Sequence, residues 1–176
     1  MQKKELRRLV ISALLLAVGI VLPMLTGQIK EIGDSLLPMH IPVMLCGVLC
    51  GAKYGSVVGA SLPIIRALTF GMPPIYPNAI WMALELATYG AVIAILYTHL
   101  RLKGKIYISL IGAMLAGRVV WGIAKAILLG LGNSSFTVRA FLIGGFVDAL
   151  PGIVLQIVLI PLIITLIEKL RLKEES

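Results

Sequence analysis

Polar and aromatic side chains recur at helical spacing inside otherwise apolar segments of this sequence. Two sets share a spacing of three and then four residues: Asn78, Trp81 and Glu85, and Arg118, Trp121 and Lys125. Residues at this spacing lie on one face of a helix. Charges inside lipid are costly, so they usually face a cavity or a partner. The chemistry to expect is non-covalent recognition, with ion pairing by the charged groups and stacking by the two indoles.

Four further candidates lie in or beside apolar segments. They are Arg66, Tyr76, Arg139 and Asp148. Tyr76 lies in a proline-rich loop, where it would be a reasonable lid residue. His40 stands beside Pro38 and Pro42, and we expect it to make a polar contact between loop and helix, with substrate contact as the alternative.

The charges in the apolar segments are unbalanced. Four cations, Arg66, Arg118, Lys125 and Arg139, face only two carboxylates, Glu85 and Asp148. An anionic solute would relieve this surplus. Two alternatives stay open: structural ion pairs between these groups, and long basic side chains that reach the water interface.

The sequence lacks the motifs of the common catalytic sites. There is no Walker A pattern, no GxSxG, no HExxH and no paired aspartate motif. These are the signatures of nucleotide, serine hydrolase and metalloprotease sites. We therefore expect no enzyme activity, no metal and no cofactor, and any use of ATP must belong to partners.

Composition indicates which elements carry these residues. Of 176 residues, 59% are hydrophobic and 14% are charged, and the mean hydropathy is +1.02. A soluble domain has about a quarter charged residues. The sequence predicts an all-α integral membrane protein with one substrate-binding domain over residues 1–176. Its six transmembrane helices are expected near residues 6–26, 39–51, 56–70, 78–98, 106–129 and 137–170, the last interrupted near Pro151, with a tight turn at 53–55 and a loop at 71–77.

Basic residues are concentrated on one side of this arrangement. With the N-terminus inside, the outer side holds only Lys30 in a loop and Arg139 at the start of a helix. The positive-inside rule then places both termini in the cytoplasm. The eleven basic residues of the inner segments are Lys3, Lys4, Arg7, Arg8, Lys53, Arg101, Lys103, Lys105, Lys169, Arg171 and Lys173.

Small residues recur every four positions in two places. Gly47, Gly51, Gly55 and Gly59 form one series, and Ala13 with Ala17 forms the other. This spacing lets helices approach closely in lipid. We expect the glycines to pack internally, whereas the alanine pair on the first helix could face a partner subunit.

The run from Cys46 to Leu68 (CGVLCGAKYGSVVGASLPIIRAL) resembles the glycine-rich second and third helices of a transporter family. The family is the substrate-binding S components of energy-coupling factor (ECF) vitamin transporters. Ala13 and Ala17 match the AxxxA motif of its first helix, and the length, six helices and cytoplasmic termini also fit.

The resemblance implies a mechanism and partners. A high-affinity binding subunit in the bacterial cell membrane would take up a vitamin or vitamin precursor from the outer side. It would dock through Ala13 and Ala17 on a transmembrane coupling subunit driven by two cytoplasmic ATPases. The cation surplus favours an anionic vitamin such as pantothenate, although a folate-like or nicotinate-like acid would also fit. The alternative is a small secondary transporter that acts alone as an oligomer.

Overall fold

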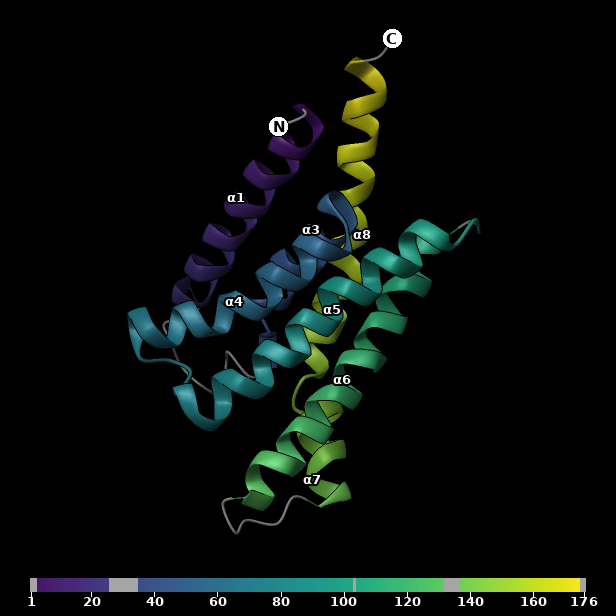
Figure 1. Ribbon diagram of the computed structural model, residues 1–176. Helices are drawn as coiled ribbons and strands as arrows, with labels where there is room; N and C mark the ends of the chain where they lie inside the picture. Colours follow the sequence, from purple (N-terminus) through teal and green to yellow (C-terminus); the bar gives the residue numbers. More distant parts are fainter. Residues whose placement is uncertain (1–2, 26–34, 103, 132–136, 175–176) are drawn as a thin grey trace.

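The computed structural model is built from helices joined by short connections (Figure 1). It describes residues 3–25, 35–102, 104–131 and 137–174, and no strand occurs among them. Each predicted helical range overlaps an observed helix. The elements are α1 (Lys3–Leu25), α3 (His40–Cys50), α4 (Ala52–Phe70), η1 (Ile75–Ala79), α5 (Ile80–His99), α6 (Lys105–Leu131), α7 (Val138–Leu142), η2 (Ile143–Val147) and α8 (Leu150–Glu174).

Glycines bring α3, α4 and α5 into backbone contact. A Cβ added to Gly59 would lie 2.3 Å from the Leu86 carbonyl oxygen, and one added to Gly90 would lie 2.3 Å from the Gly55 carbonyl oxygen. A Cβ on Gly47 would lie 2.5 Å from the Gly90 carbonyl oxygen. Only glycine allows helices to approach this closely. The prediction of internal packing is therefore confirmed for these glycines.

Gly51 does not make a close contact between helices, because a Cβ there would meet no atom within 4 Å. Its φ of 96° and ψ of 172° break the chain between α3 and α4. A positive φ suits glycine, which has no Cβ to clash with the backbone. The predicted tight turn at 53–55 is wrong, since α4 begins at Ala52 and these residues are already helical.

Helix α1 is held against α3 and α4 along its length. The Tyr54 hydroxyl donates to Glu5 Oε2 at 2.8 Å, and the Cys46 thiol donates to Ser12 Oγ at 3.4 Å. Near the other end, Arg66 Nη1 donates to the Ile20 carbonyl oxygen. The opposite face of α1, which includes Ala13 and Ala17, is exposed.

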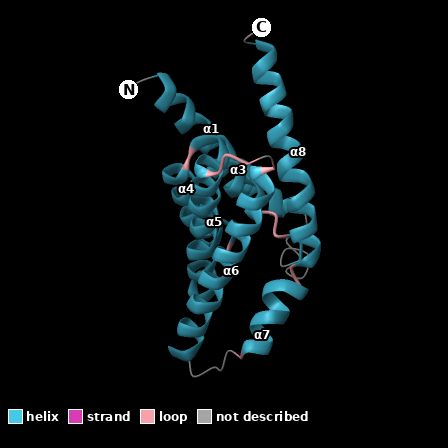
Figure 2. Ribbon diagram, turned by 90° about the vertical axis from the view of Figure 1, so that its right-hand side faces the viewer, coloured by secondary structure: helices cyan, strands magenta, loops and turns pink. Residues whose placement is uncertain are grey.

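The last predicted helix is divided into three elements. The break falls at Asp148 and Ala149, close to the predicted interruption at Pro151, and η2 is a wide turn before it. Figure 2 shows α7 and α8 on one side of the bundle formed by α4, α5 and α6. The start of α8 packs on the chain before α3, because a Cβ on Gly152 would lie 2.6 Å from the Ser35 carbonyl oxygen.

Four helices in the described part of the chain are long and apolar enough to cross a membrane. Two shorter apolar helices, His40–Cys50 and Val138–Val147, accompany them. The N- and C-termini lie at the same end of the molecule (Figure 1). The four long segments are Lys3–Met24, Ile75–His99, Lys105–Gly130 and Leu150–Leu170.

Candidate functional site

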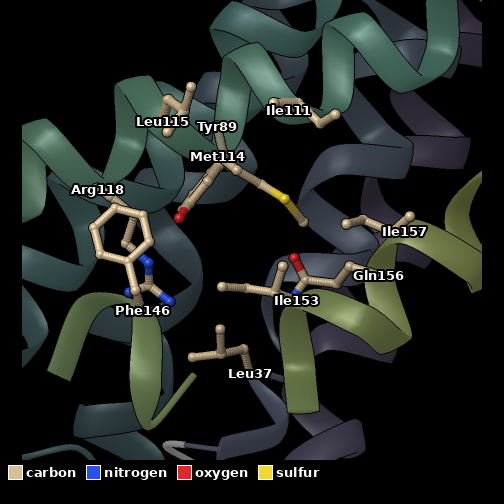
Figure 3. Close-up of a pocket in the computed structure, with 10 residues that line it drawn as sticks. All are labelled: Leu37, Tyr89, Ile111, Met114, Leu115, Arg118, Phe146, Ile153, Gln156 and Ile157. Atoms are coloured by element: carbon tan, nitrogen blue, oxygen red, sulfur yellow. The ribbon is translucent and has the colours of Figure 1, made fainter. Parts of the chain in front are cut away.

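A cavity of about 170 Å³ lies between α5, α6, η2 and α8 (Figure 3). Most of its wall is apolar, and the polar groups come from Tyr89 on α5, Arg118 on α6 and Gln156 on α8. The apolar wall consists of Leu37, Ile111, Met114, Leu115, Phe146, Ile153 and Ile157. Such a cavity suits a ligand with an apolar body and a few polar contacts.

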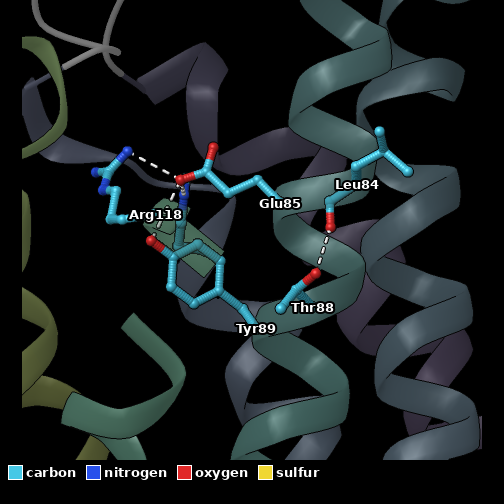
Figure 4. Close-up of polar contacts among 6 residues, drawn as sticks. Leu84, Glu85, Thr88, Tyr89 and Arg118 are labelled. Atoms are coloured by element: carbon cyan, nitrogen blue, oxygen red, sulfur yellow. Dashed lines mark hydrogen bonds and ion pairs between the residues drawn. The ribbon is translucent and has the colours of Figure 1, made fainter. Parts of the chain in front are cut away.

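Glu85, Arg118, Tyr89 and His40 form a polar cluster next to the cavity, which Tyr89 and Arg118 also line. Figure 4 shows Glu85, Tyr89 and Arg118 of this cluster. Glu85 Oε1 accepts a hydrogen bond from Arg118 Nη1 at 2.9 Å and another from the Tyr89 hydroxyl at 3.2 Å. Both charged side chains are buried, Glu85 at 2% and Arg118 at 4% exposure. The Glu85 carboxylate therefore holds the Arg118 guanidinium at the cavity wall. The same carboxylate oxygen also accepts the hydrogen bond from Tyr89.

His40 completes the polar cluster without a hydrogen bond to it. Its Nε2 lies 3.5 Å from Glu85 Oε1, but the geometry is not that of a hydrogen bond, and neither ring nitrogen has a partner among the described residues. The ring packs edge-on against Tyr89, with centroids 5.0 Å apart. The predicted polar contact between loop and helix is therefore wrong: His40 belongs to α3, and its ring packs on Tyr89 of α5.

Two buried donors at the cavity have no partner in the described part of the structure. They are Arg118 Nη2 and Gln156 Nε2. A buried donor without an acceptor costs about 1–3 kcal/mol, and more when the group is charged. Each of these two atoms exposes less than 1 Å², so neither contributes to the surface of the cavity, although both residues line it.

A second group, the Trp–Lys cluster of Trp81, Trp121 and Lys125, adjoins the polar cluster. Lys125 Nζ lies 5.3 Å from the Trp81 ring centroid and 4.6 Å from that of Trp121. Arg118 Cζ lies 5.7 Å from the Trp121 centroid, which joins the two clusters. Cations over indole faces are stabilised by the ring quadrupole. The two helical faces singled out in the sequence therefore meet between α5 and α6.

The other predicted binding residues lie elsewhere. Arg66 is buried, contacts α1 through Ile20 and lies over the Phe70 ring, at 5.2 Å from its centroid. Tyr76 is exposed, and its hydroxyl donates to the Leu128 carbonyl oxygen at 3.4 Å, which links η1 to α6. Asn78 is half-buried, whereas Arg139 and Asp148 are exposed. These five residues are not among the described residues that line the cavity.

A family model described as "ECF transporter, substrate-specific component" matches residues 7–164. The chain belongs to this family. It is therefore a membrane transport protein and not an enzyme, and membership implies substrate binding together with an ECF module as partner. No curated protein and no solved structure matches it.

Two polar residues of this S component that line the cavity were not singled out from the sequence. Tyr89 lies four positions after Glu85, so it shares the face that carries the carboxylate. Gln156 is a single amide within the apolar run 150–164. A polar group in such a run is itself a signal of function in a membrane protein.

Proposed function

We propose that this S component is a high-affinity membrane receptor for a vitamin or vitamin precursor and that the cavity is its binding site. The observation that carries the proposal is the apolar cavity with Tyr89, Arg118 and Gln156 in its lining, in a chain that belongs to the substrate-specific component family. A cavity with a mostly apolar wall and a few polar groups is typical of a small-molecule site.

The charges of the helices that flank the cavity support an anionic substrate. Among the buried and half-buried groups of α4, α5 and α6, Arg66, Lys105, Arg118 and Lys125 are cationic and Glu85 is the carboxylate. We propose a vitamin acid such as pantothenate as the first candidate. Arg118 would contact the acid directly, Glu85 would hold Arg118 in place, and the Trp–Lys cluster would support the same wall.

We further propose a single domain over residues 1–176 with six membrane spans and cytoplasmic termini, in a bacterial cell membrane. The basic ends of α1 and α8, together with Lys53 and Arg101, would then lie on the inner side. The cavity would take substrate from the outer side, where Tyr76, Asn78, Arg139 and Asp148 would surround the approach. Transport would require a coupling subunit docked at Ala13 and Ala17 and driven by two separate ATPases.

The direct test is to identify what the protein carries. The full chain, purified in mild detergent without added ligand, would be denatured and its released small molecules identified by mass spectrometry. We expect a stoichiometric acid that is lost from Arg118→Met and retained by Val119→Leu, a matched change at an exposed position next to it. A protein that carries no ligand and catalyses counterflow alone in liposomes would instead be a secondary transporter.

A further inference from the structure

We infer that the second half of α8 is a hinged arm and that a clasp of Tyr97, Glu168 and Lys105 holds this arm closed. The arm consists of residues 162–170, which follow Pro161 and lead from the cavity to the end of the molecule that carries both termini (Figure 1). When the clasp is released, the arm bends at Pro161 and separates from α5. This movement does not depend on which substrate the protein binds.

The clasp joins three helices at the end with the termini. The Tyr97 hydroxyl of α5 donates to Glu168 Oε1 of α8 at 2.6 Å. Lys105 Nζ, at the start of α6, lies 4.0 Å from the centroid of the same tyrosine ring. A hydrogen bond to a carboxylate is stronger than one between neutral groups, and a cation over a ring adds an electrostatic attraction. The Tyr97 ring is therefore held both at its hydroxyl and at its face.

The remaining contacts of this part of α8 are apolar. Ile160, Ile164 and Glu168 follow at intervals of four residues, so they share the face of α8 that packs on the bundle. Both isoleucines are buried in the core. Transfer of Ile164 from this contact to acyl chains costs little, because lipid tails are as apolar as the side chain. The bond between Tyr97 and Glu168 therefore does most to distinguish the closed arm from an open one.

Pro161 supplies the hinge. It lies inside α8, and proline has no backbone N–H, so the Ile157 carbonyl oxygen lacks its usual partner within the helix. Sharp bends in helices occur mostly at proline. Ile157 also lines the cavity, one turn before Pro161. The arm therefore begins directly after the cavity wall.

The clasp is placed where it can be released. Glu168 is exposed and Tyr97 is half-buried. In both views the last turns of α8 project beyond α5 and α6 (Figure 1, Figure 2). One hydrogen bond of this kind changes the ratio of closed to open arm by about tenfold. A contact of this size favours the closed position without locking it, as a moving part requires.

Distances between spin labels on the full chain in lipid nanodiscs test the arm. Labels at Ile95→Cys on α5 and Leu166→Cys on α8 form the arm pair, and labels at Leu84→Cys and Val154→Cys on the same two helices form the reference pair before the hinge. All four positions are exposed. The two native cysteines are buried, so protein without introduced cysteines is the labelling blank. Double electron–electron resonance measures both distance distributions.

Variants of the clasp should open the arm. Tyr97→Phe removes the hydroxyl and keeps the ring, so the arm pair should gain a longer distance, with the ratio of open to closed arm raised about tenfold. The reference pair should stay unchanged. Glu168→Gln weakens the acceptor and should act in the same direction by a smaller factor. Tyr107→Phe, at an exposed tyrosine on α6, is the matched control and should give the wild-type distances.

A variant of the hinge separates a clasped arm from a loosened helix. Alanine at position 161 restores the missing N–H, so Tyr97→Phe/Pro161→Ala should return the arm pair to its wild-type distance. Size-exclusion profiles show whether each variant is folded, and Glu168→Gln carries the test if Tyr97→Phe does not fold. An unchanged arm pair in the clasp variants would overturn the inference.

Two further results would also overturn it: opening that persists in the double variant, and equal broadening of the arm pair and the reference pair. Neither result bears on the proposed function, because the distances are measured without ligand. Failure to recover a bound solute would contradict the proposed function and leave the hinged arm intact.

Discussion

At the scale of single residues, the decisive arrangement is the set of donors around Glu85 Oε1. Arg118 and Tyr89 donate to this one oxygen, and His40 lies 3.5 Å from it. Breaking a buried ion pair by removing one charge is costly, because the other charge is left without compensation. Glu85 therefore makes a buried arginine tolerable beside the cavity.

The first prediction concerns this ion pair. Glu85→Gln should lower the free energy of unfolding by about 3–5 kcal/mol, because the buried Arg118 loses its countercharge. The double variant Glu85→Gln/Arg118→Met should be more stable than the single one. Thermal unfolding in detergent measures both. The control is Arg8→Gln, which breaks the half-exposed Arg8–Glu5 pair, leaves the Tyr54 bond to Glu5 in place and is expected within about 1 kcal/mol of wild type. A single variant as stable as the control would contradict the arrangement.

Helical periodicity in the sequence predicted the charged residues of this site but not its uncharged polar residues. Charges in apolar segments are conspicuous, so Glu85, Arg118 and Lys125 were found and placed on facing helices. Which partner Arg118 takes depends on the distance between helices, which spacing along the chain does not contain. Tyr89 and Gln156 carry no charge, so a search for charged residues in apolar segments does not identify them.

At the scale of elements, the spacing between helices is set by missing side chains. Gly47, Gly55, Gly59 and Gly90 place α3, α4 and α5 in backbone contact, and Tyr89 packs on Gly117 of α6. These close contacts form a tight layer of helices and fix the position of α5, and Tyr89 of α5 lines the cavity. The sequence predicted the glycine contacts because the four-residue interval repeats, but it misplaced the turn after α3, since Gly51 and Gly55 look alike until their φ angles are known.

The second prediction tests this layer. Gly90→Ala should destabilise the protein by about 1–3 kcal/mol or more, because the new Cβ would lie 2.3 Å from Gly55 backbone atoms that have no room to move. Gly130→Ala, where a Cβ would meet nothing within 4 Å, should be neutral or stabilising by up to about 1 kcal/mol. Thermal unfolding midpoints compare the two. Equal effects would mean that the layer tolerates an added methyl group and that the helix contact is looser than described.

At the scale of the whole molecule, the two ends of the bundle differ in chemistry. The end with both termini carries the basic residues of α1, α4 and α8, and there the Tyr97 hydroxyl donates to Glu168 Oε1 at 2.6 Å, which ties α5 to α8. The cavity lies within the bundle, where α8 meets α5 and α6. Hydropathy and charge predicted this division, and the break between η2 and α8 at Asp148 and Ala149 lies close to the interruption predicted at Pro151.

The third prediction concerns the exposed face of α1. Ala13 and Ala17 lie on this face among large apolar side chains, including Leu14 at 63% and Val10 at 59% exposure. If a coupling subunit docks there, small residues permit its close approach. The double variant Ala13→Trp/Ala17→Trp should therefore lose at least tenfold in co-purification with the ECF module when both are expressed together.

Binding of substrate by the same double variant separates docking from folding. Neither alanine lines the cavity, so ligand affinity should stay within about twofold of wild type. Ala126→Trp, at an exposed alanine on α6, is the matched control and should retain both the ECF module and the ligand. Loss of the module from both variants would point to a general defect of insertion. Retention by the α1 variant would place the docking surface on another helix, because two indoles cannot be accommodated where helix backbones meet.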